Sequence, residues 1–410
     1  MSFDMKNKSY SILIIGMYGI PSHIERFIRN LKQTNPSASI TLFSDRDKQS
    51  FSGDTFEYLD EYIQRDTYSG WPHRLWKFRP WLNKYAFVKQ FKKLLKERHY
   101  DIVNIHFPTY HVCPVMRSLK KISSTIVVSP WGSDVLRVDP KKKKRLSRIF
   151  KNADYITVGS TGMFGKVLHQ EMRIKEDKFH PLAWGSETID FINDHINDIS
   201  KERAKEILHL SGKYLITCGY NAFEEQRHEV IINAINSKRK ELPDNMTLLF
   251  PVTYGSSYGN RKHDYVERLK TLCDELQLPV VFFEDYLSVS ELFILRRATD
   301  MFIHIQTTDG GNSSLQEYVL CGAKVVHGTW IHYVNLEQYK PLFYYPVNSL
   351  DELGDVVVNA FHSDSIQTPS QVLDYIRNRG WKAKMKLWDD FFTALYRTHS
   401  IRKRQLLRKK

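Results

Sequence analysis

The stretch that decides the fold runs from Thr307 to Val326 and reads TTDGGNSSLQEYVLCGAKVV. We expect a strand to end before it, a Gly-Gly loop to turn the chain, and a helix to begin with hydroxyl side chains. Gly322 then allows the chain to leave the helix and enter the next strand. Unpaired backbone N–H groups and the positive end of the helix dipole make such a helix start an anion-binding site. The candidates for holding a diphosphate there are Gly310, Gly311, Asn312, Ser313 and Ser314.

Two carboxylates flank this helix start, with seven residues between them. Asp309 precedes the expected helix and Glu317 lies about one turn inside it, so both side chains can face one crevice. One acid can then contact a sugar and the other a ribose, while the backbone amides hold a diphosphate.

Short runs rich in Ile and Val alternate with charged helical stretches along the chain. In the first half we expect a helix at Ile24–Leu31 and strands at Ser11–Ile15, Ile40–Phe43, Ile102–Ile105, Thr125–Val128 and Tyr155–Val158. In the second half we expect strands at Tyr214–Thr217, Thr247–Phe250, Val280–Phe283, Met301–Ile305 and Lys324–Val326, and helices at Glu229–Asn236, Tyr265–Leu276, Ser290–Arg297 and Ser313–Leu320. This order is typical of parallel sheets covered on both faces. The sequence predicts an α/β protein of two Rossmann-like, doubly wound domains facing a cleft.

The length of 410 residues suits two such domains. We place the N-terminal domain at residues 1–190, a linker at 191–206 and the C-terminal domain at 207–377. A helix over 378–410 is expected to pack back on the first domain.

Several function classes lack their motifs in this sequence. The turn Gly16-Met17-Tyr18-Gly19 is not a G-x-G-x-x-G fingerprint, which disfavours a dehydrogenase, and no P-loop occurs. The four cysteines are scattered, which suits a reducing compartment. The D-x-D motif at residues 45–47 follows only the second strand, so a solvated loop is the better interpretation. No cluster of His, Cys or Asp has metal spacing, and we expect neither a metal nor a cofactor.

Positive charge is concentrated in one part of the sequence. Residues 71–151 contain twenty Lys or Arg and four acids, and this asymmetry indicates an anionic partner. Within this segment we expect a helix at Lys84–Arg98, with Tyr85, Val88, Phe91, Leu94 and Leu95 along one side and lysines on the other. Just ahead of it, aromatic and cationic residues interleave, and an anionic membrane surface is expected to contact Trp71, Arg74, Trp76, Lys77 and Trp81. The alternative is a core-packed helix with a solvated lysine face.

The longest nearly apolar run, Tyr10 to Ile20, is shorter than the ~20 residues that span a bilayer. It follows two lysines, as the core of a signal peptide would, but no small-x-small cleavage site comes after it. We interpret it as a buried first strand. We therefore expect a cytoplasmic protein that lies peripherally on the inner face of the cell membrane.

The two acids and their surroundings resemble the GT-B glycosyltransferases, in particular the family 4 enzymes and their E-x7-E motif. Asp309 and Glu317 fall on the two acids of that motif, with Asp in place of the first Glu, which shortens its reach. The resemblance implies that Glu317 binds the ribose and Asp309 the sugar. It also implies that the first domain binds the acceptor and the second the nucleotide-sugar donor.

Other segments are similar to that family in the same order. Residues 101–106 (DIVNIH) resemble its strand ending in a histidine near the sugar, which makes His106 a catalytic candidate or a packed strand end. Residues 129–134 (SPWGSD) resemble its His-Gly-Ser-Asp turn, and Asp134 is a candidate base or a helix N-cap. Residues 215–219 (LITCG) resemble the strand before its phosphate clamp, but Tyr220 replaces the arginine. The donor-site candidates in the glycine turns and this loop are Gly16, Gly219 and Arg227.

A second resemblance, confined to the second half, is to the family 56 transferases of lipid-linked 4-acetamido-4,6-dideoxygalactose. It rests on residues 251–255 (PVTYG), 285–287 (DYL) and 297–300 (RATD), and it adds Tyr254 to the donor-site candidates. Family 4 enzymes retain the anomeric configuration and family 56 enzymes invert it, so the stereochemical outcome stays open.

We expect an enzyme that moves a hexosyl or deoxyaminohexosyl group from a nucleotide-sugar donor to a lipid-linked or polysaccharide acceptor in bacterial surface polysaccharide synthesis. A nucleotide-sugar epimerase of the same architecture is an alternative, and it would form product without any acceptor. A nucleic-acid-binding protein using the basic segment is another. No helix-turn-helix, RRM or zinc signature supports it, so nucleic acid is not among the expected partners.

Overall fold

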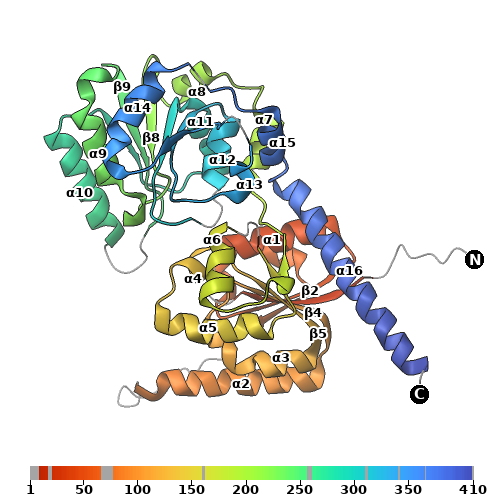
Figure 1. Ribbon diagram of the computed structural model, residues 1–410. Helices are drawn as coiled ribbons and strands as arrows, with labels where there is room; N and C mark the ends of the chain where they lie inside the picture. Colours follow the sequence, from red (N-terminus) through yellow and green to blue (C-terminus); the bar gives the residue numbers. More distant parts are fainter. Residues whose placement is uncertain are drawn as a thin grey trace, which may run out of the picture. The chain divides into compact units, whose positions relative to one another are not determined.

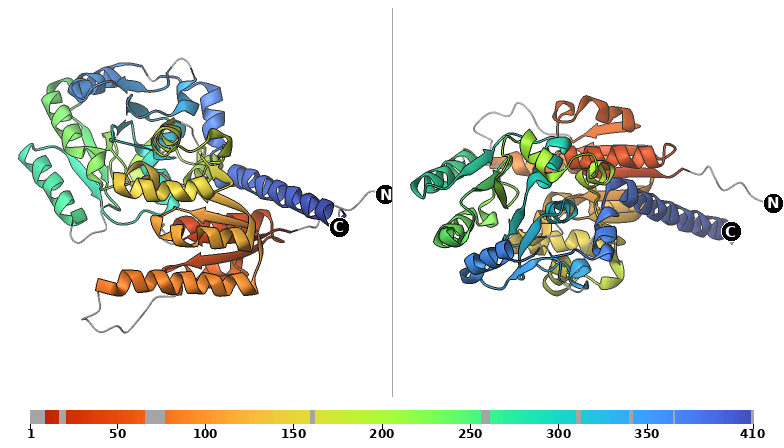
Figure 2. Two further views of the ribbon diagram at one scale, coloured as in Figure 1. Left: turned by 60° about the horizontal axis from the view of Figure 1, so that its bottom comes forward. Right: turned by 90° about the horizontal axis from the view of Figure 1, so that it is seen from above.

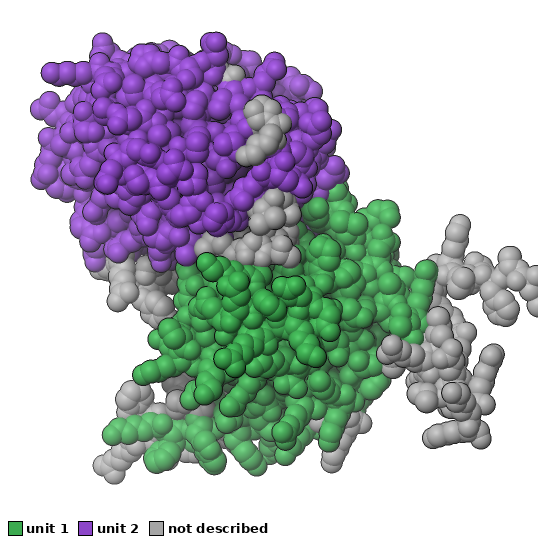
Figure 3. All heavy atoms as spheres, in the orientation of Figure 1, with its two compact units in different colours: residues 1–184, 382–410 green, residues 185–381 purple. Residues whose placement is uncertain are grey.

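The computed structural model describes residues 9–16, 21–65, 77–158, 162–255, 261–309, 313–339, 342–364 and 366–408. The chain divides into two compact units, which Figure 3 distinguishes by colour. Unit 1 combines Met1–Trp184 with Lys382–Lys410, and unit 2 is Gly185–Trp381. Each unit contains a parallel sheet of its own.

Unit 1 is organised by a sheet that has seven parallel strands in the described ranges. These strands are β1 (Ser11–Gly16), β2 (Ser39–Ser44), β3 (Glu61–Gln64), β4 (Tyr100–His106), β5 (Ser123–Ser129), β6 (Tyr155–Thr157) and β7 (Phe179–His180). They are arranged β3-β2-β1-β4-β5-β6-β7, so the order reverses between β1 and β4. The Ile and Val side chains of the central strands are fully buried, as in a sheet covered on both faces.

Helices cover both faces of this sheet (Figure 1). They are α1 (Pro21–Thr34), η1 (Lys48–Ser50), η2 (Gly53–Tyr58), α2 (Arg79–Glu97), η4 (Tyr110–Val115), α3 (Met116–Ile122), α4 (Ser133–Leu136), α5 (Pro140–Asn152), α6 (Gly162–Gly165), η5 (Lys166–Glu171), η6 (Glu176–Lys178) and α16 (Trp381–Arg408). The helices α2 and α3 lie side by side on one face, as the views of Figure 2 also show. Phe91 of α2 and Phe150 of α5 belong to the same apolar cluster on that face.

The C-terminal helix α16 contributes to the core of unit 1 on the other face. The ring of Trp388 lies 5.1 Å from the ring of Phe27 on α1, and its indole N–H donates to the carbonyl oxygen of Ala183 at 3.0 Å. The hydroxyl of Tyr10 donates to the Asp389 carboxylate at 2.7 Å. The two pieces of chain that form unit 1 therefore share one interior.

Unit 2 is organised by a sheet that has six parallel strands in the described residues. These strands are β8 (Tyr214–Cys218), β9 (Met246–Pro251), β10 (Val280–Phe283), β11 (Met301–His304), β12 (Lys324–Gly328) and β13 (Tyr345–Val347). They are arranged β10-β9-β8-β11-β12-β13, so the order reverses between β8 and β11. The carboxyl ends of strands beside such a reversal are the usual ligand site of open α/β sheets.

The helices of unit 2 lie on both faces of its sheet (Figure 1). They are α7 (Glu187–His195), α8 (Lys201–Ile207), η7 (Glu224–Gln226), α9 (His228–Ser237), η8 (Arg239–Glu241), α10 (Arg261–Glu275), α11 (Val289–Ala298), α12 (Ser313–Leu320), α13 (Val334–Glu337), η9 (Leu350–Glu352), α14 (Leu353–His362) and α15 (Ser370–Arg377). On one face α9, α10 and α14 pack together, and on the other α11 contacts α7, α8 and α12. Serine side chains cap the starts of α7, α8 and α11.

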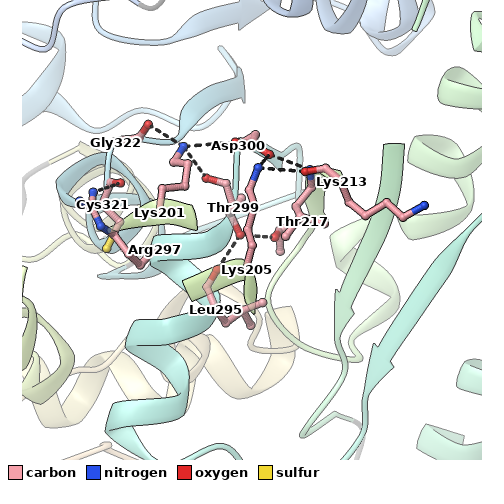
Figure 4. Close-up of polar contacts among 11 residues, drawn as sticks. Lys201, Lys205, Lys213, Thr217, Leu295, Arg297, Thr299, Asp300, Cys321 and Gly322 are labelled. Atoms are coloured by element: carbon pink, nitrogen blue, oxygen red, sulfur yellow. Dashed lines mark hydrogen bonds and ion pairs between the residues drawn. The ribbon is translucent and has the colours of Figure 1, made fainter. Parts of the chain in front are cut away.

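Residues 191–206, where the sequence suggests a linker, lie in unit 2 and include most of α8. Lys201 and Lys205 are one helical turn apart, and both reach the Asp300 carboxylate, with N–O distances of 3.4 and 2.6 Å (Figure 4). Asp300 also accepts the backbone N–H of Leu215 at 2.8 Å. These bonds fasten α8 to the amino ends of β8 and β11.

The predicted fold class, two doubly wound α/β units with parallel sheets, is confirmed. The sequence did not predict the short strands β3, β7 and β13, which lie at sheet edges. No helix in the described ranges has an apolar stretch long enough to cross a lipid bilayer.

Candidate functional site

The carboxyl ends of β8 and β11 carry most of the predicted donor-site residues of unit 2. Gly219 directly follows β8, Asp309 follows β11, and α12 begins at Ser313 and contains Glu317. Gly310, Gly311 and Asn312 lie outside the described residues. The fold thus places both predicted acids next to the reversal of strand order, where this kind of sheet binds nucleotides.

Asp309 is buried, and its oxygen Oδ2 is the acceptor of two side-chain donors. The Tyr333 hydroxyl donates to it at 2.8 Å, and the Gln306 amide donates to it as well. Nε2 of His304 lies 3.4 Å from the same oxygen. Hydrogen bonds to a carboxylate are directional, so the donors Tyr333 and Gln306 fix the orientation of Asp309.

His304 is itself oriented by a second histidine. It pairs in register with His327 on β12, and the two Nδ1 atoms are 3.1 Å apart. Nε2 of His327 lies 3.2 Å from the carbonyl oxygen of Ile331, which can only accept, so this nitrogen carries a proton. Burial lowers the pKa of His327 to about 3, so its ring is neutral and its Nδ1 accepts a hydrogen bond from His304.

Gln306 joins the loop after β8 to Asp309. Its Oε1 accepts from the Tyr220 hydroxyl at 3.2 Å and from the Gln226 amide at 2.7 Å. Its own amide nitrogen is thereby directed at Asp309. The indole N–H of Trp330 donates to the backbone oxygen of Gln306 at 2.7 Å. One fully buried amide therefore connects two loops at the carboxyl edge of the sheet.

Glu317 is 3% exposed, and each oxygen of its carboxylate accepts a hydrogen bond. The Ser186 hydroxyl donates to Oε1 at 3.0 Å, and Nε of Arg296 donates to Oε2 at 3.3 Å. Burial lowers the pKa of Arg296, but Tyr318 and Glu317 outweigh this effect, so the net pKa is raised and the guanidinium stays charged. Glu317 thus belongs to a buried ion pair as well as to the predicted ribose site.

The remaining donor-site candidates of unit 2 lie around these acids. Gly219 has a φ of 64°, and a Cβ there would lie 2.8 Å from Nε2 of His228, so only glycine fits. Arg227 donates to the carbonyl oxygen of Ile305 at 3.3 Å, and burial lowers the pKa of its guanidinium. Ser314 is mostly buried at the start of α12. Tyr254, 45% exposed, follows β9, and its hydroxyl lies 3.4 Å from the Asn221 amide.

In unit 1, His106 ends β4 beside the reversal of strand order, in register with Gly16 of β1. A chain of hydrogen bonds reaches it across the sheet from Thr157 through Ser129 and Asn104. Because Asn104 accepts from Ser129 with its oxygen, its amide nitrogen donates to Nε2 of His106 at 2.8 Å. Burial lowers the pKa of His106 to about 3, so the ring is neutral, with its proton on Nδ1.

Asp134 closes a turn at the start of α4. Asp134 lies inside α4, and its carboxylate accepts the backbone N–H groups of two residues before the helix, Trp131 at 2.9 Å and the N-cap residue Gly132 at 2.7 Å. Burial raises the pKa of Asp134 to about 7, and these two hydrogen bonds oppose the shift. Asp134 is therefore not the N-cap of α4, and a catalytic role for it stays a prediction.

The predicted membrane face is described in part, because Trp71, Arg74 and Trp76 lie outside the described residues. Lys77 is exposed, as is Trp81 at 65%. Tyr85, expected on the same side of the helix as Phe91, is 53% exposed, whereas Phe91 and the adjacent Ala86 and Phe87 are buried. Phe78 is the N-cap residue of α2 and is spaced to lie along the same face as Trp81 and Tyr85, whose rings stack with centroids 6.3 Å apart.

Within the part of the chain that the structure describes, no group of three or more His, Cys, Asp or Glu side chains is arranged to hold a metal ion. In the D-x-D motif, Asp47 accepts from the Gln64 amide at 2.5 Å, and burial raises the pKa of Asp45. These contacts suit a structured loop after β2.

Several residues of these networks were not predicted from the sequence. Gln306 lies just past the end of an expected strand, and that position is a signal that could have identified it. The contacts of Ser186, Arg296 and Tyr333 with the acids depend on the tertiary fold, and no local pattern marks them.

Comparisons with known proteins agree with this architecture. Residues 67–160 match the family model described as "Glycosyl transferase 4-like". No curated protein sequence matches the chain.

Solved structures of similar fold extend over nearly the whole chain. A glycosyltransferase from Rickettsia africae is 15% identical with a TM-score of 0.69, covering 95% of this chain and 99% of its own. HepE of Anabaena, solved with UDP and glucose, is 13% identical with a TM-score of 0.63, covering 97% and 100%. The lipopolysaccharide outer core galactosyltransferase WaaB is 14% identical with a TM-score of 0.64, covering 94% and 99%. The chain thus has the GT-B fold of such enzymes, and its residues 67–160 are similar to the glycosyl transferase 4-like family.

Proposed function

We propose that the protein is a glycosyltransferase that moves a sugar from a nucleotide-sugar donor to a lipid-linked or polysaccharide acceptor. The observation that carries the proposal is the pair Asp309 and Glu317, both buried and oriented by side chains at the carboxyl edge of the unit 2 sheet. The matched family model and the glycosyltransferases of similar fold support the same activity.

In the proposed reaction the donor lies at the carboxyl ends of β8 and β11. The ribose contacts Glu317, the diphosphate lies at the start of α12, and the sugar reaches Asp309. As the bond to the sugar breaks, negative charge develops on the leaving diphosphate, where backbone N–H groups and the cation of Arg227 stabilise it. Catalysis then depends mainly on positioning and on this charge stabilisation.

The stereochemical outcome follows from the choice between the two resemblances. The family model matched by residues 67–160 supports family 4, and with it retention of the anomeric configuration, over the family 56 alternative. The anomeric configuration of the product, measured by NMR, decides between them.

Donor binding provides the direct test of the proposal. Two of the similar structures are of HepE with UDP or UDP-glucose, so UDP-sugars are the first choice for this chain. In a panel of UDP-, GDP- and dTDP-sugars, we expect saturable hydrolysis of at least one donor, persisting in excess EDTA because the predicted diphosphate site uses amides and Arg227. Loss of activity in EDTA that Mg²⁺ or Mn²⁺ restores would contradict metal independence, and inertness toward the whole panel would contradict the activity.

The acceptor is proposed to be presented at an anionic membrane surface. Phe78, Trp81 and Tyr85 form an exposed aromatic stripe on α2, and the exposed lysines beside it are Lys77, Lys84, Lys89, Lys92 and Lys93. Basic residues near anionic lipid contribute on the order of 1 kcal/mol each, and inserted aromatic rings add an apolar contribution that salt does not screen. This combination suits a peripheral contact on the inner face of the cell membrane.

Vesicle flotation tests this contact. We expect strong binding to vesicles with phosphatidylglycerol, weak binding to neutral ones, and only partial release by high salt. The double variant Trp81→Ser/Tyr85→Ser should lose the salt-resistant fraction and keep donor hydrolysis. Tyr286→Ser is the matched control, because it removes an exposed aromatic ring (70% exposed) from unit 2. No binding of the intact protein to anionic vesicles at low salt would contradict the proposal and favour a soluble acceptor.

A further inference from the structure

The first residues of unit 2 reach the Glu317 carboxylate through one hydroxyl group. Oγ of Ser186 donates to Oε1 of Glu317 at 3.0 Å, and the same atom accepts the backbone N–H of Ile189 at 3.3 Å as the N-cap of α7. The cap uses the acceptor side of the hydroxyl, which leaves its single proton for Glu317. We propose that Ser186 is a positioning residue that holds Glu317 in place for the ribose of the donor, an inference that rests on the proposed function.

The other side of the carboxylate is held by Arg296. Its Nε donates to Oε2 at 3.3 Å, and its Nη1 donates to the Tyr318 hydroxyl at 2.9 Å. The next residue, Arg297, donates to the carbonyl oxygen of Cys321 at 3.2 Å, which ties the end of α11 to α12 (Figure 4). A carboxylate oxygen accepts more than one hydrogen bond, so each oxygen can still accept from a ribose hydroxyl.

Ser186 is suited to this task because its own backbone is fixed. Its N–H donates to the carbonyl oxygen of Arg379 at 3.0 Å, and it forms a parallel bridge with Gly380. A Cβ on Gly185 would lie 2.6 Å from Cα of Trp381, and one on Gly380 would overlap the Asp190 carboxylate. The two segments therefore approach as closely as only glycine allows, and the hydroxyl of Ser186 is presented from a rigid base.

The contact from Ser186 to Glu317 should affect how the protein recognises the ribose hydroxyls of a nucleotide. With the hydroxyl removed, Oε1 of Glu317 loses a partner and the carboxylate can turn about Arg296. A carboxylate held in place can accept from both vicinal hydroxyls of a ribose, whereas a mobile one loses that selectivity. Removing the Ser186 hydroxyl should therefore reduce the preference for UDP over 2′-deoxy-UDP more than it reduces the affinity for UDP itself.

Calorimetric titration with UDP and 2′-deoxy-UDP tests this dependence. For the wild-type protein we expect UDP to bind about tenfold more tightly than 2′-deoxy-UDP, the effect of one hydrogen bond to a charged group. In Ser186→Ala and Ser186→Gly the preference should fall to about threefold or less. Because Gly maintains the helix cap almost as well as Ser, Ser186→Gly shows the effect of the lost hydroxyl without loss of the cap. Ser186→Thr retains both the cap and the hydroxyl, and should retain the preference.

The matched control is Ser200→Ala, which removes the N-cap hydroxyl of the neighbouring helix α8 without contact to Glu317. A wild-type preference that survives in Ser186→Gly, or that falls equally in Ser200→Ala, would overturn the inference. So would a wild-type protein that binds both nucleotides equally. A wild-type protein that binds no UDP at all contradicts the proposed use of UDP-sugars itself, so the two failures are distinguishable.

Discussion

The Glu317→Ala protein is expected to bind UDP at least tenfold more weakly than the wild-type protein and to unfold more easily. Hydrogen bonds from ribose hydroxyls to a charged carboxylate contribute about 1.5–3 kcal/mol, which accounts for the loss of affinity. From the sequence alone, this change is expected to leave the fold intact. The structure predicts otherwise, because the change leaves Arg296 buried without its carboxylate, at a cost of about 3–5 kcal/mol. Calorimetry and urea unfolding measure the two effects.

A double variant separates these two roles of Glu317. Replacing the ion pair by apolar side chains of similar size, as in Arg296→Met/Glu317→Leu, removes the uncompensated charge, so most of the stability should return. The affinity for UDP should stay low, since the ribose contact is still missing. If the double variant recovered both the stability and the affinity for UDP, the ribose role would be contradicted and Glu317 would be a structural residue only.

The second large effect is expected at Asp309. Asp309→Asn should lower the rate of sugar transfer by about 100-fold, a typical effect of losing one charge-stabilising group at a reacting centre. Asparagine retains a carbonyl oxygen that can accept from Tyr333 and Gln306, so the fold should be unchanged. The affinity for UDP should also be unchanged, because Asp309 is proposed to contact the sugar.

Tyr333→Phe serves as the matched control for Asp309. It removes one of the donors to Oδ2 of Asp309 and leaves the charge of the carboxylate. The rate of sugar transfer is therefore expected to decrease only a few-fold, from loss of the hydrogen bond alone. Full transfer activity in Asp309→Asn, or an equally large loss in Tyr333→Phe, would contradict a direct role of the Asp309 charge.

The strands that the sequence predicts correctly are those with the strongest apolar signal. The runs at β1, β4, β5, β8 and β11 are rich in apolar residues because these strands are buried on both faces. The strand β3 (EYIQ) is at a sheet edge and is half exposed, and β7 has only two residues. Edge strands carry little hydrophobic pattern, so such elements are identified only once their neighbours are in place.

The acids of the candidate site could be predicted because the helix start and the spacing are local features. The partners of those acids could not. Ser186 is 131 residues from Glu317 in sequence and Arg296 is 21 residues away. Only the packing of α7 and α11 against α12 brings these side chains to one carboxylate. Tyr85 is exposed although Phe91, expected on the same side of the helix, is buried, because helical spacing alone does not show where on α2 the core begins.

The return of α16 to unit 1 has a consequence for how the chain is made. Trp388 and Asp389, which contact Phe27 and Tyr10, leave the ribosome only after the whole of unit 2 has been synthesised. At about 5–20 residues per second, the roughly 200 residues of unit 2 take on the order of 10–40 s to synthesise, and during that time the first piece of unit 1 lacks α16. Unit 2 is contiguous and can fold as soon as it emerges, so the second unit of the sequence is the first to be completed. Until then, the face of unit 1 that carries Phe27 is exposed apolar surface, which makes the nascent chain a substrate for chaperones.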